Sequence, residues 1–316
     1  MQFSIVIPTY NRRHTIGAAI ESVLVQGPSE IEVIVVDDGS SDGTMEWITQ
    51  AYARQPVRIL RNVRLKGPAG GRNTGIQAAK GELVAFLDSD DAFLPGHLAE
   101  AWAAFQRFPE LEVLFGRARY ERDGLPEEYM GANFDRKLEI AQKTYSDESL
   151  SVFSPDFFAH LLEYGCWFNL STVVMRAGAA RERMEESLRI AEDYEFWVRL
   201  ARHRRFGCLH GHQIRYTLHE GNISFEASET AEGNAPQLFR AYQMMLGYPG
   251  LTRAQRRLIE DRIATLFFEW AYRSKTHGLW LESASLHARS MRYGRIGANL
   301  VALAKLPLSL LASGIR

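Results

Sequence analysis

Cysteine is scarce in this chain, and so are long apolar runs. The 316 residues include only Cys166 and Cys208, far apart and without a CxxC pair, which argues against a disulfide framework or a zinc knuckle and favours a reducing compartment. No stretch approaches the roughly 20 apolar residues that a membrane-spanning helix needs. The first residues, MQFSIVIPTYN, resemble a strand and carry no basic leader. We therefore expect no secretory signal and a cytoplasmic location.

An excess of charge of either sign is also missing. Lys and Arg number 37 against 38 Asp and Glu, a net charge of -1, whereas nucleic-acid-binding surfaces usually make a domain strongly basic. We therefore expect no nucleic-acid partner, while small polar ligands remain open. With 46% hydrophobic residues the chain is long enough for one large domain, or for one domain with an appendage.

The first third of the chain alternates short β-branched runs with amphipathic stretches. FSIVIPTY, IEVIVVDDG, VRIL and ELVAFLDSDD are strand-like, and helical patterns separate them. This alternation is typical of βαβ units, and strands apolar on both faces predict a mostly parallel central sheet flanked by helices. The pattern weakens from about Glu127 to Tyr164, where we expect a long, partly helical loop.

Helical patterns follow one another from Glu232 onward. We place a boundary near Ser224 to Gly233, which predicts an α/β domain over 1–228 and a C-terminal helical region over 229–316.

Polar residues gather where three predicted strands end. In an open α/β sheet, ligands bind at the carboxyl ends of the strands. The three ends read Pro8, Thr9, Tyr10 and Asn11; Asp37, Asp38, Gly39 and Ser40; and Asp88, Ser89, Asp90 and Asp91. Crowded carboxylates repel unless cations or hydrogen-bond donors sit among them, and oxygen ligands of this kind suit Mg²⁺ or Mn²⁺. Alternatively, these acids form turns and caps, with Asp38-Gly39 as a turn and Asp91 capping the next helix.

Four motifs carry a family resemblance. IVIPTYNR, VIVVDDGSSDGT, GGRNTGIQAAKGELVAFLDSDD and AEDYEFWVRLA, in this order and spacing, resemble family 2 glycosyltransferases over about residues 1–225. The resemblance implies the GT-A fold, a Rossmann-like α/β domain. It places nucleotide-sugar binding in residues 1–110 and the acceptor and catalytic half in residues 111–228.

The resemblance also implies donor-binding residues. Pro8, Thr9, Tyr10 and Asp38 would hold the nucleobase, and Asn11 would contribute to nucleotide-sugar binding. Tyr10 offers a stacking face, and an ionised Asp38 can accept the imide N–H of uracil, which favours a UDP-sugar. Tyr10 as a packed rim aromatic is the alternative.

Arg72 and Asn73 would, by the same resemblance, face the nucleotide or the sugar. A surface cation is the plainer interpretation of Arg72.

Asp88 and Asp90 match the DxD element of the family. Asp90 would bind Mn²⁺ or Mg²⁺ at the diphosphate. Asp88 would contact the sugar or ribose and also contribute to the metal site, and Ser89 would contribute to nucleotide-sugar binding. The metal would act as a Lewis acid on the leaving diphosphate. Relatives often bring a histidine to this place, and His219 is the candidate here, although a structural histidine is the commoner case.

Glu192 and Asp193 match the catalytic ED pair. Asp193 would act as general base on an acceptor hydroxyl, and a single displacement would invert the anomeric configuration. The alternative is that Glu192 and Glu195 cap the start of a helix. Before this pair the family usually has a Gly-Phe-Asp-Glu-type stretch, of which only Glu186, Ser187 and Leu188 preserve a part.

Other activities fit the sequence less well. DSDDAF resembles the start of a DxDx[TV] phosphatase motif, but Ala92 stands at the Thr or Val position. GPAGGRNTG lacks the GxGxxG spacing of dinucleotide dehydrogenases. A degenerate subunit that binds nucleotide or a partner protein without turnover is the non-enzymatic alternative, although Asp38, Asp90 and Asp193 are all present.

The C-terminal segment 283–316 carries five basic and no acidic residues among apolar ones. We expect either peripheral contact with an anionic membrane, where lipid-linked acceptors are found, or packing on the core or on a second subunit as a homodimer. The family suggests a glycan or lipid-linked acceptor in bacterial surface or extracellular polysaccharide assembly.

Overall fold

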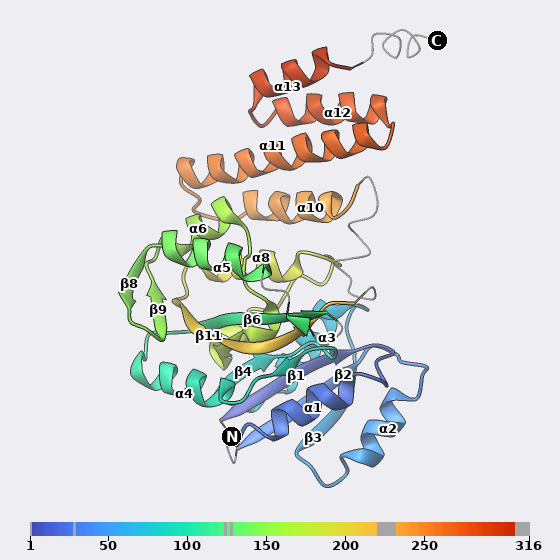
Figure 1. Cartoon of the computed structure of the whole chain (residues 1–316), viewed down its shortest axis with the longest axis vertical. Helices are drawn as coiled ribbons and strands as arrows, with labels where there is room; N and C mark the ends of the chain where they lie inside the picture. Colours follow the sequence, from blue (N-terminus) through green and yellow to red (C-terminus); the bar gives the residue numbers. More distant parts are fainter. Residues whose placement is uncertain (1, 28–29, 123–124, 127–128, 220–231, 307–316) are drawn as a thin grey trace. The chain divides into compact units, whose positions relative to one another are not determined.

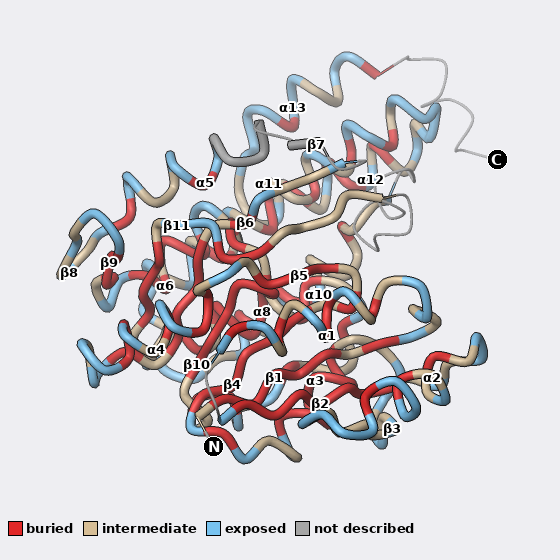
Figure 2. The backbone as a smooth tube through the Cα atoms, turned by 60° about the horizontal axis from the view of Figure 1, so that its bottom comes forward, coloured by how far each residue is buried: buried red, intermediate tan, exposed pale blue. Residues whose placement is uncertain are grey.

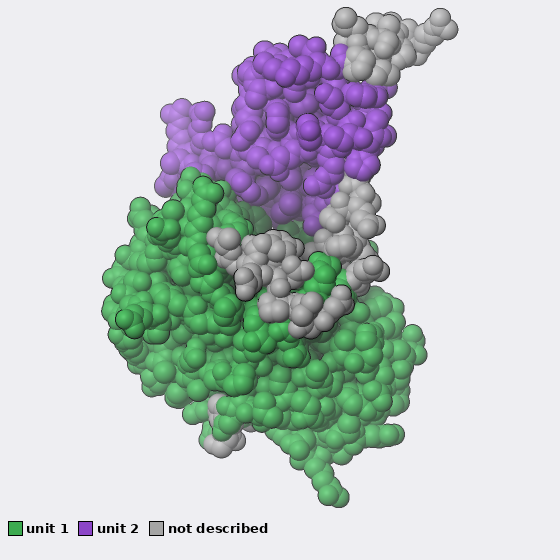
Figure 3. All heavy atoms as spheres, viewed as in Figure 1, with its two compact units in different colours: residues 1–219 green, residues 220–316 purple. Residues whose placement is uncertain are grey.

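The computed structural model describes residues 2–27, 30–122, 125–126, 129–219 and 232–306. The chain divides into two compact units, residues 1–219 and 220–316 (Figure 3). The predicted boundary between 228 and 229 lies outside the described residues.

The first unit is built on one twisted sheet with helices on its faces (Figure 1). Its parallel part has the order β3-β2-β1-β4, so the first strand of the chain lies in the middle. These strands and the helices between them are β1 (Phe3–Thr9), α1 (Ile16–Leu24), β2 (Ile31–Asp37), α2 (Thr44–Ala51), β3 (Val57–Arg61), α3 (Pro68–Ala78) and β4 (Leu83–Phe86). A short strand, β5 (Ala92–Phe93), and the helix α4 (His97–Arg107) follow β4 along the chain. Every residue of β2 and β4 is buried, as strands covered on both faces require (Figure 2). The predicted α/β fold with a mostly parallel centre is confirmed.

The sheet continues beyond β4 with mixed pairing. β10 runs antiparallel to β4 and β6, and β11 runs parallel to β6. The elements of this half are β6 (Val113–Arg122), β7 (Leu125–Pro126), η1 (Leu170–Thr172), β10 (Val174–Arg176), α7 (Ala177–Ala180), α8 (Glu192–Leu200) and β11 (Phe206–Thr217).

The long, partly helical loop predicted for residues 127–164 is confirmed in its helices, but the prediction missed a strand hairpin. This segment contains α5 (Tyr129–Ile140), a hairpin of β8 (Lys143–Ser146) and β9 (Leu150–Phe153), and α6 (Phe157–Tyr164). β9 is only four residues long, and it is held by pairing with β11, where Val152 lies opposite Gly207. A strand this short shows no clear period, and its partner lies far away in the sequence.

Two glycines of GGRNTG let α3 lie close against β1. A Cβ atom on Gly75 would come within 2.3 Å of a Val6 methyl group, and one on Gly71 within 3.1 Å of the Pro8 Cβ. This approach brings the neighbouring residues Arg72 and Asn73 to the carboxyl end of the sheet.

The second unit consists of helices in the described residues: α10 (Ala235–Leu246), α11 (Arg253–Thr276), α12 (Trp280–Met291) and α13 (Ile296–Ala304). A capping box begins α11, with the Thr252 hydroxyl accepting from the Gln255 N–H and the Gln255 side chain accepting from the Thr252 N–H. None of the described helices in either unit has the length and apolarity needed to cross a bilayer.

Candidate active site

The two acids at the end of β2, Asp37 and Asp38, have different hydrogen-bond partners. Asp37 is buried, and its carboxylate accepts hydrogen bonds from the N–H groups of Gly39 and Ser40. It therefore forms the turn, in which Gly39 takes a φ of 91° that suits glycine. Asp38 instead accepts from Asn62 Nδ2 at 2.7 Å and from the Gly67 N–H at 2.9 Å. Asp38 thus fixes both ends of the loop 62–67 and keeps acceptor capacity on each oxygen.

The end of β1 presents an aromatic ring toward solvent. Tyr10 is 46% exposed, and the Lys66 ammonium lies 4.0 Å from its ring centroid. The packed-rim interpretation of Tyr10 therefore does not describe the structure. The Asn11 side chain accepts from the Ser41 N–H, while Pro8 and Thr9 belong to β1 itself. The buried Thr9 hydroxyl finds no hydrogen-bond partner among the described residues.

Arg72 joins two motifs that lie 120 residues apart. Its side chain donates to Asp88 Oδ1 at 2.7 Å and to Glu192 Oε1 at 2.9 Å, and the residue is 5% exposed. Burial alone would lower the pKa of Arg72, but the carboxylates of Asp88 and Glu192 outweigh it and raise that pKa. Arg72 is a buried bridge between the DSDD run and the ED pair, and not a plain surface cation.

Asn73 is placed differently from the expectation that it faces the ligand. It is 1% exposed, and its amide exchanges two hydrogen bonds with the backbone of Met184 and donates a third to Glu186. Protein contacts therefore occupy both N–H donors of the amide. Asn73 holds the segment that precedes the ED pair.

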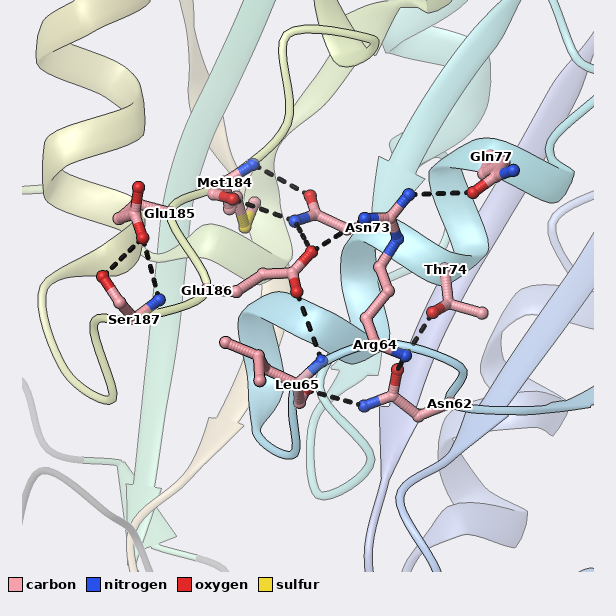
Figure 4. A network of polar contacts seen from close by, with 10 residues as sticks. All are labelled: Asn62, Arg64, Leu65, Asn73, Thr74, Gln77, Met184, Glu185, Glu186 and Ser187. Carbon is pink, nitrogen blue, oxygen red and sulfur yellow. Dashed lines mark hydrogen bonds and ion pairs between the residues drawn. The ribbon is translucent and has the colours of Figure 1, made fainter.

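Glu186 is the centre of a polar network between the loop 62–67 and the segment 184–187 (Figure 4). Its carboxylate accepts from Arg64, from the Leu65 N–H and from Asn73. Burial would raise the pKa of Glu186, but these donors outweigh it and lower that pKa. Glu186 is one of the three residues that preserve part of the family's stretch before the ED pair. Its hydrogen bonds connect the loop 62–67, which Asp38 also holds, to the segment that precedes Glu192.

The crowded acids after β4 each have a separate environment. Asp88 pairs with Arg72, and Asp90 Oδ2 lies 3.1 Å from His219 Nε2 and 3.5 Å from Arg12 Nη2. Sequence reasoning missed Arg12, although it directly follows the polar end of β1. Ser89, between the two acids, is buried.

Asp91 does not cap the next helix, because α4 begins after Gly96. It is buried and accepts from the Ser171 hydroxyl at 2.6 Å, while that hydroxyl accepts from the Asp88 N–H. Burial, together with Asp88 and Asp90, raises the pKa of Asp91 well above its usual range.

The ED pair begins α8 after a strained residue. Ala191 has a φ of 66°, uncommon for a residue with a side chain, and gives α8 no side-chain cap. Glu195 pairs with Arg199, so the alternative, in which Glu192 and Glu195 cap the helix, is not what the structure has. The positive φ at Ala191 turns the chain so that Glu192 meets Arg72.

The two acids of the pair differ in their contacts. Glu192 is buried in its ion pair with Arg72, whereas Asp193 is partly exposed and accepts from the Tyr194 N–H. Burial and the neighbouring Asp193 raise the pKa of Glu192 to about 7, and burial also raises the pKa of Asp193. A carboxylate with a raised pKa in a partly exposed residue suits a general base, which favours Asp193 for that role and Glu192 for positioning.

The side chains at the end of β4 supply some, but not all, of the ligands that a divalent cation needs. Within the described residues, no three His, Cys, Asp or Glu side chains gather as a ready-made metal site. Asp90 and His219 lie together and supply an oxygen and an imidazole nitrogen, both suitable for Mn²⁺. Two protein ligands suit a cation that takes its remaining ligands from diphosphate oxygens and water.

The sequence model of glycosyl transferase family 2 matches residues 4–161, half of the chain. The chain belongs to glycosyl transferase family 2. The match includes the ends of β1, β2 and β4 and the GGRNTG motif, while the ED pair lies C-terminal to it.

Curated proteins similar in sequence to this chain are also named as glycosyltransferases. The chain is 26% identical, over 96% of its length and 86% of the relative's, to the GalNAc(5)-diNAcBac-PP-undecaprenol beta-1,3-glucosyltransferase of Campylobacter jejuni. Matches to several other curated relatives span 33% to 39% of those proteins' length. Together these findings make this family 2 member an enzyme, a glycosyltransferase.

Solved structures share the fold of this glycosyltransferase at low identity. S. aureus TarS 1-349, crystallised in complex with UDP-GlcNAc, superposes with a TM-score of 0.65 at 21% identity, covering 93% of this chain and 81% of that one. The mannosyltransferase PcManGT from Pyrobaculum calidifontis, in complex with GDP-Man and Mn²⁺, gives a TM-score of 0.57 at 15% identity, covering 96% and 80%. These likenesses show that the fold is GT-A.

Proposed function

We propose that this enzyme is an inverting, divalent-metal-dependent transferase that moves a sugar from a UDP-sugar to a hydroxyl of a lipid-linked glycan. The observation that carries the proposal is the buried Arg72 bridge from Asp88 to Glu192. It holds the acids of the expected donor site next to those of the expected catalytic pair, with Asp90 and His219 beside them.

The donor assignment rests on the ends of β1 and β2. The exposed ring of Tyr10 can stack on a nucleobase, and Asp38 keeps acceptor capacity for the imide N–H of uracil. UDP-GlcNAc bound to TarS supports a uridine donor. The GDP-Man bound to PcManGT is the competing base on the same fold.

The reaction follows from the placement of the acids. Asp193 removes the proton of the acceptor hydroxyl as that oxygen attacks the anomeric carbon, and the bond from this carbon to the diphosphate oxygen breaks on the opposite face. The sugar is inverted, and UDP leaves. Glu192, fixed by Arg72, holds the start of α8 and thereby orients Asp193.

Asp90 and His219 are the residues that would hold Mn²⁺ or Mg²⁺. When bound, such a cation neutralises the negative charge that develops on the leaving diphosphate. Arg12, 3.5 Å from Asp90, is a second positive charge for the same region.

The acceptor assignment rests on the C. jejuni relative, whose name gives an undecaprenol-linked glycan as its substrate. By analogy we assign this chain to surface or extracellular polysaccharide assembly at the cytoplasmic face of the membrane. Segment 283–316 would make the peripheral contact, and a homodimer through this region is the competing arrangement.

A panel of nucleotide sugars tests the proposal. We expect release of UDP from UDP-glucose, UDP-galactose or their N-acetylated forms when Mn²⁺ and a polyprenyl-diphosphate glycan are present. Chelator should abolish this release, and added Mn²⁺ should restore it. Release only from GDP- or dTDP-sugars would contradict the uridine assignment. Nucleotide binding without any release would identify the non-enzymatic subunit instead.

A further inference from the structure

The last described helix of the second unit, α13, exposes an apolar face. Ile296, Leu300 and Val301 are 60%, 55% and 57% exposed. Gly297 and Ala304 are exposed as well, and positions 296, 297, 300, 301 and 304 share one face of a helix. Figure 2 draws α13 largely in the colours of exposed and intermediate residues. The apolar face of this helix is thus turned toward solvent.

The buried side of α13 is polar. Asn299 is the buried residue of this helix. Its Oδ1 accepts from His287 Nδ1 at 2.7 Å, and its Nδ2 donates to the Ser290 hydroxyl and the Arg295 carbonyl. His287 and Ser290 belong to α12, against which α13 lies (Figure 1).

This arrangement is the reverse of an ordinary surface helix, which packs its apolar stripe inward and shows polar residues to water. The hydrogen bonds from Asn299 to His287 and Ser290 fix the rotation of α13 about its own axis against α12 and leave its apolar side outward. The outward face therefore fits an apolar medium better than it fits water.

Positively charged residues stand at both ends of α13. Arg292, Arg295 and Lys305 flank α13 and are exposed, and no acidic residue occurs between 283 and 306. Over residues 233–306, eleven Lys and Arg stand against four Asp and Glu. Apolar residues beside exposed cations are typical of helices that lie on anionic lipid.

We propose that the outer face of α13 binds the surface of an anionic bilayer, with Ile296, Leu300 and Val301 at the level of the head groups. The helix has nine residues, about 14 Å of length, so it lies on the membrane and does not cross it. Ahead of α13, residues Ser283–Met291 belong to α12, where Ser283, Leu286, His287 and Ser290 are buried, so the proposed contact is assigned to α13. The membrane setting rests on the proposed lipid-linked acceptor.

A second copy of the chain is the less favoured occupant. A two-fold interface through α13 would bring the same patch of each copy together. The exposed Arg292, Arg295 and Lys305 of both copies would then repel one another, whereas anionic lipid neutralises them.

Vesicle co-sedimentation of the full chain tests the inference. Large vesicles of phosphatidylcholine with 30% phosphatidylglycerol should bind the protein, and vesicles of phosphatidylcholine alone should bind it at least several-fold less. Val301→Glu should lower the partition coefficient on the anionic vesicles about tenfold, because it removes apolar burial and adds a like charge at the lipid surface. Val25→Glu is the matched control, since Val25 is 73% exposed in the first unit, and it should bind as the unmodified protein does.

Equal binding of Val301→Glu and Val25→Glu, or no vesicle binding at all, would overturn the inference. So would a concentration-dependent dimer in solution that Val301→Glu breaks, because the face would then join two copies. No donor or acceptor is present in this assay. Its failure therefore leaves UDP release in the nucleotide-sugar panel intact, and failure of that panel leaves the vesicle result intact.

Discussion

Asp193→Asn should lower the rate of sugar transfer by about a thousandfold while the affinity for UDP stays within about twofold. General-base catalysis contributes roughly a hundred- to ten-thousandfold in enzymes, and an amide of the same shape cannot take the proton. Asp193 is partly exposed at the start of α8 and accepts from its neighbour's N–H, so the substitution leaves the Arg72 bridge in place. The measurement is kcat from UDP release, together with a calorimetric Kd for UDP.

Asp156→Asn is the matched control for this prediction. Asp156 also stands at the start of a helix, α6, where its side chain makes no capping hydrogen bond. Its loss should leave kcat unchanged. If Asp193→Asn keeps most of its activity while Glu192→Gln loses it, the base is Glu192 and the assignment of roles within the pair is wrong.

Arg72→Met should destabilise the fold by about 3–5 kcal/mol, the usual cost of removing one partner from a buried ion pair. Asp88 and Glu192 lose their shared donor, and Glu192 is left buried without it. Urea unfolding followed by tryptophan fluorescence measures the effect. Arg64→Met is the control: Arg64 is less buried and pairs with Glu186, so its loss should cost about 1 kcal/mol or less.

Arg72→Met should also move the pH profiles. Burial raises the pKa of Glu192 to about 7 from an ordinary 4.5, and Arg72 opposes this rise. In the unmodified protein, kcat should climb with rising pH as the Glu192–Asp193 pair ionises, with Glu192 losing its proton at about 7. The contribution of Glu192 to stability is largest below about pH 4.5 and is lost as the pH rises through about 7.

Without the Arg72 cation, the rise of kcat and the loss of the stability that Glu192 contributes should both move to higher pH. Arg72→Lys, which keeps a charge but not the two-pronged geometry, should leave the acid limb of kcat near its original position. An acid limb that stays in place in Arg72→Met would show that Arg72 does not act on the catalytic pair.

The sequence predicted those parts of the site that local patterns determine. β1, β2 and β4 are apolar runs that stop at polar residues, and parallel strands bring such ends to one edge. Tyr10 and Asp38 therefore lie at the expected strand ends. The pairing of Asp90 with the predicted partner His219 also agrees with the family resemblance.

The sequence could not predict contacts that depend on the tertiary fold. Arg72 meets Glu192 across 120 residues, and Asp91 meets Ser171 across 80. No periodicity carries such information. The same limit explains Asn73, a polar residue beside Arg72 that turns to the backbone of Met184 instead of the ligand site. It also explains Asp91, whose neighbours after β4 suggested a cap, whereas η1 buries it.

The most direct test of the account is calorimetric titration of the purified protein with UDP, GDP and dTDP, each with Mn²⁺ and with chelator, alongside Asp90→Ala. UDP should bind tightest of the three, its binding should need Mn²⁺, and Asp90→Ala should abolish the metal-dependent part of that binding. Tight binding of UDP that ignores both chelator and Asp90→Ala would contradict the metal assignment. No binding of any of the three nucleotides under either condition would contradict the transferase itself.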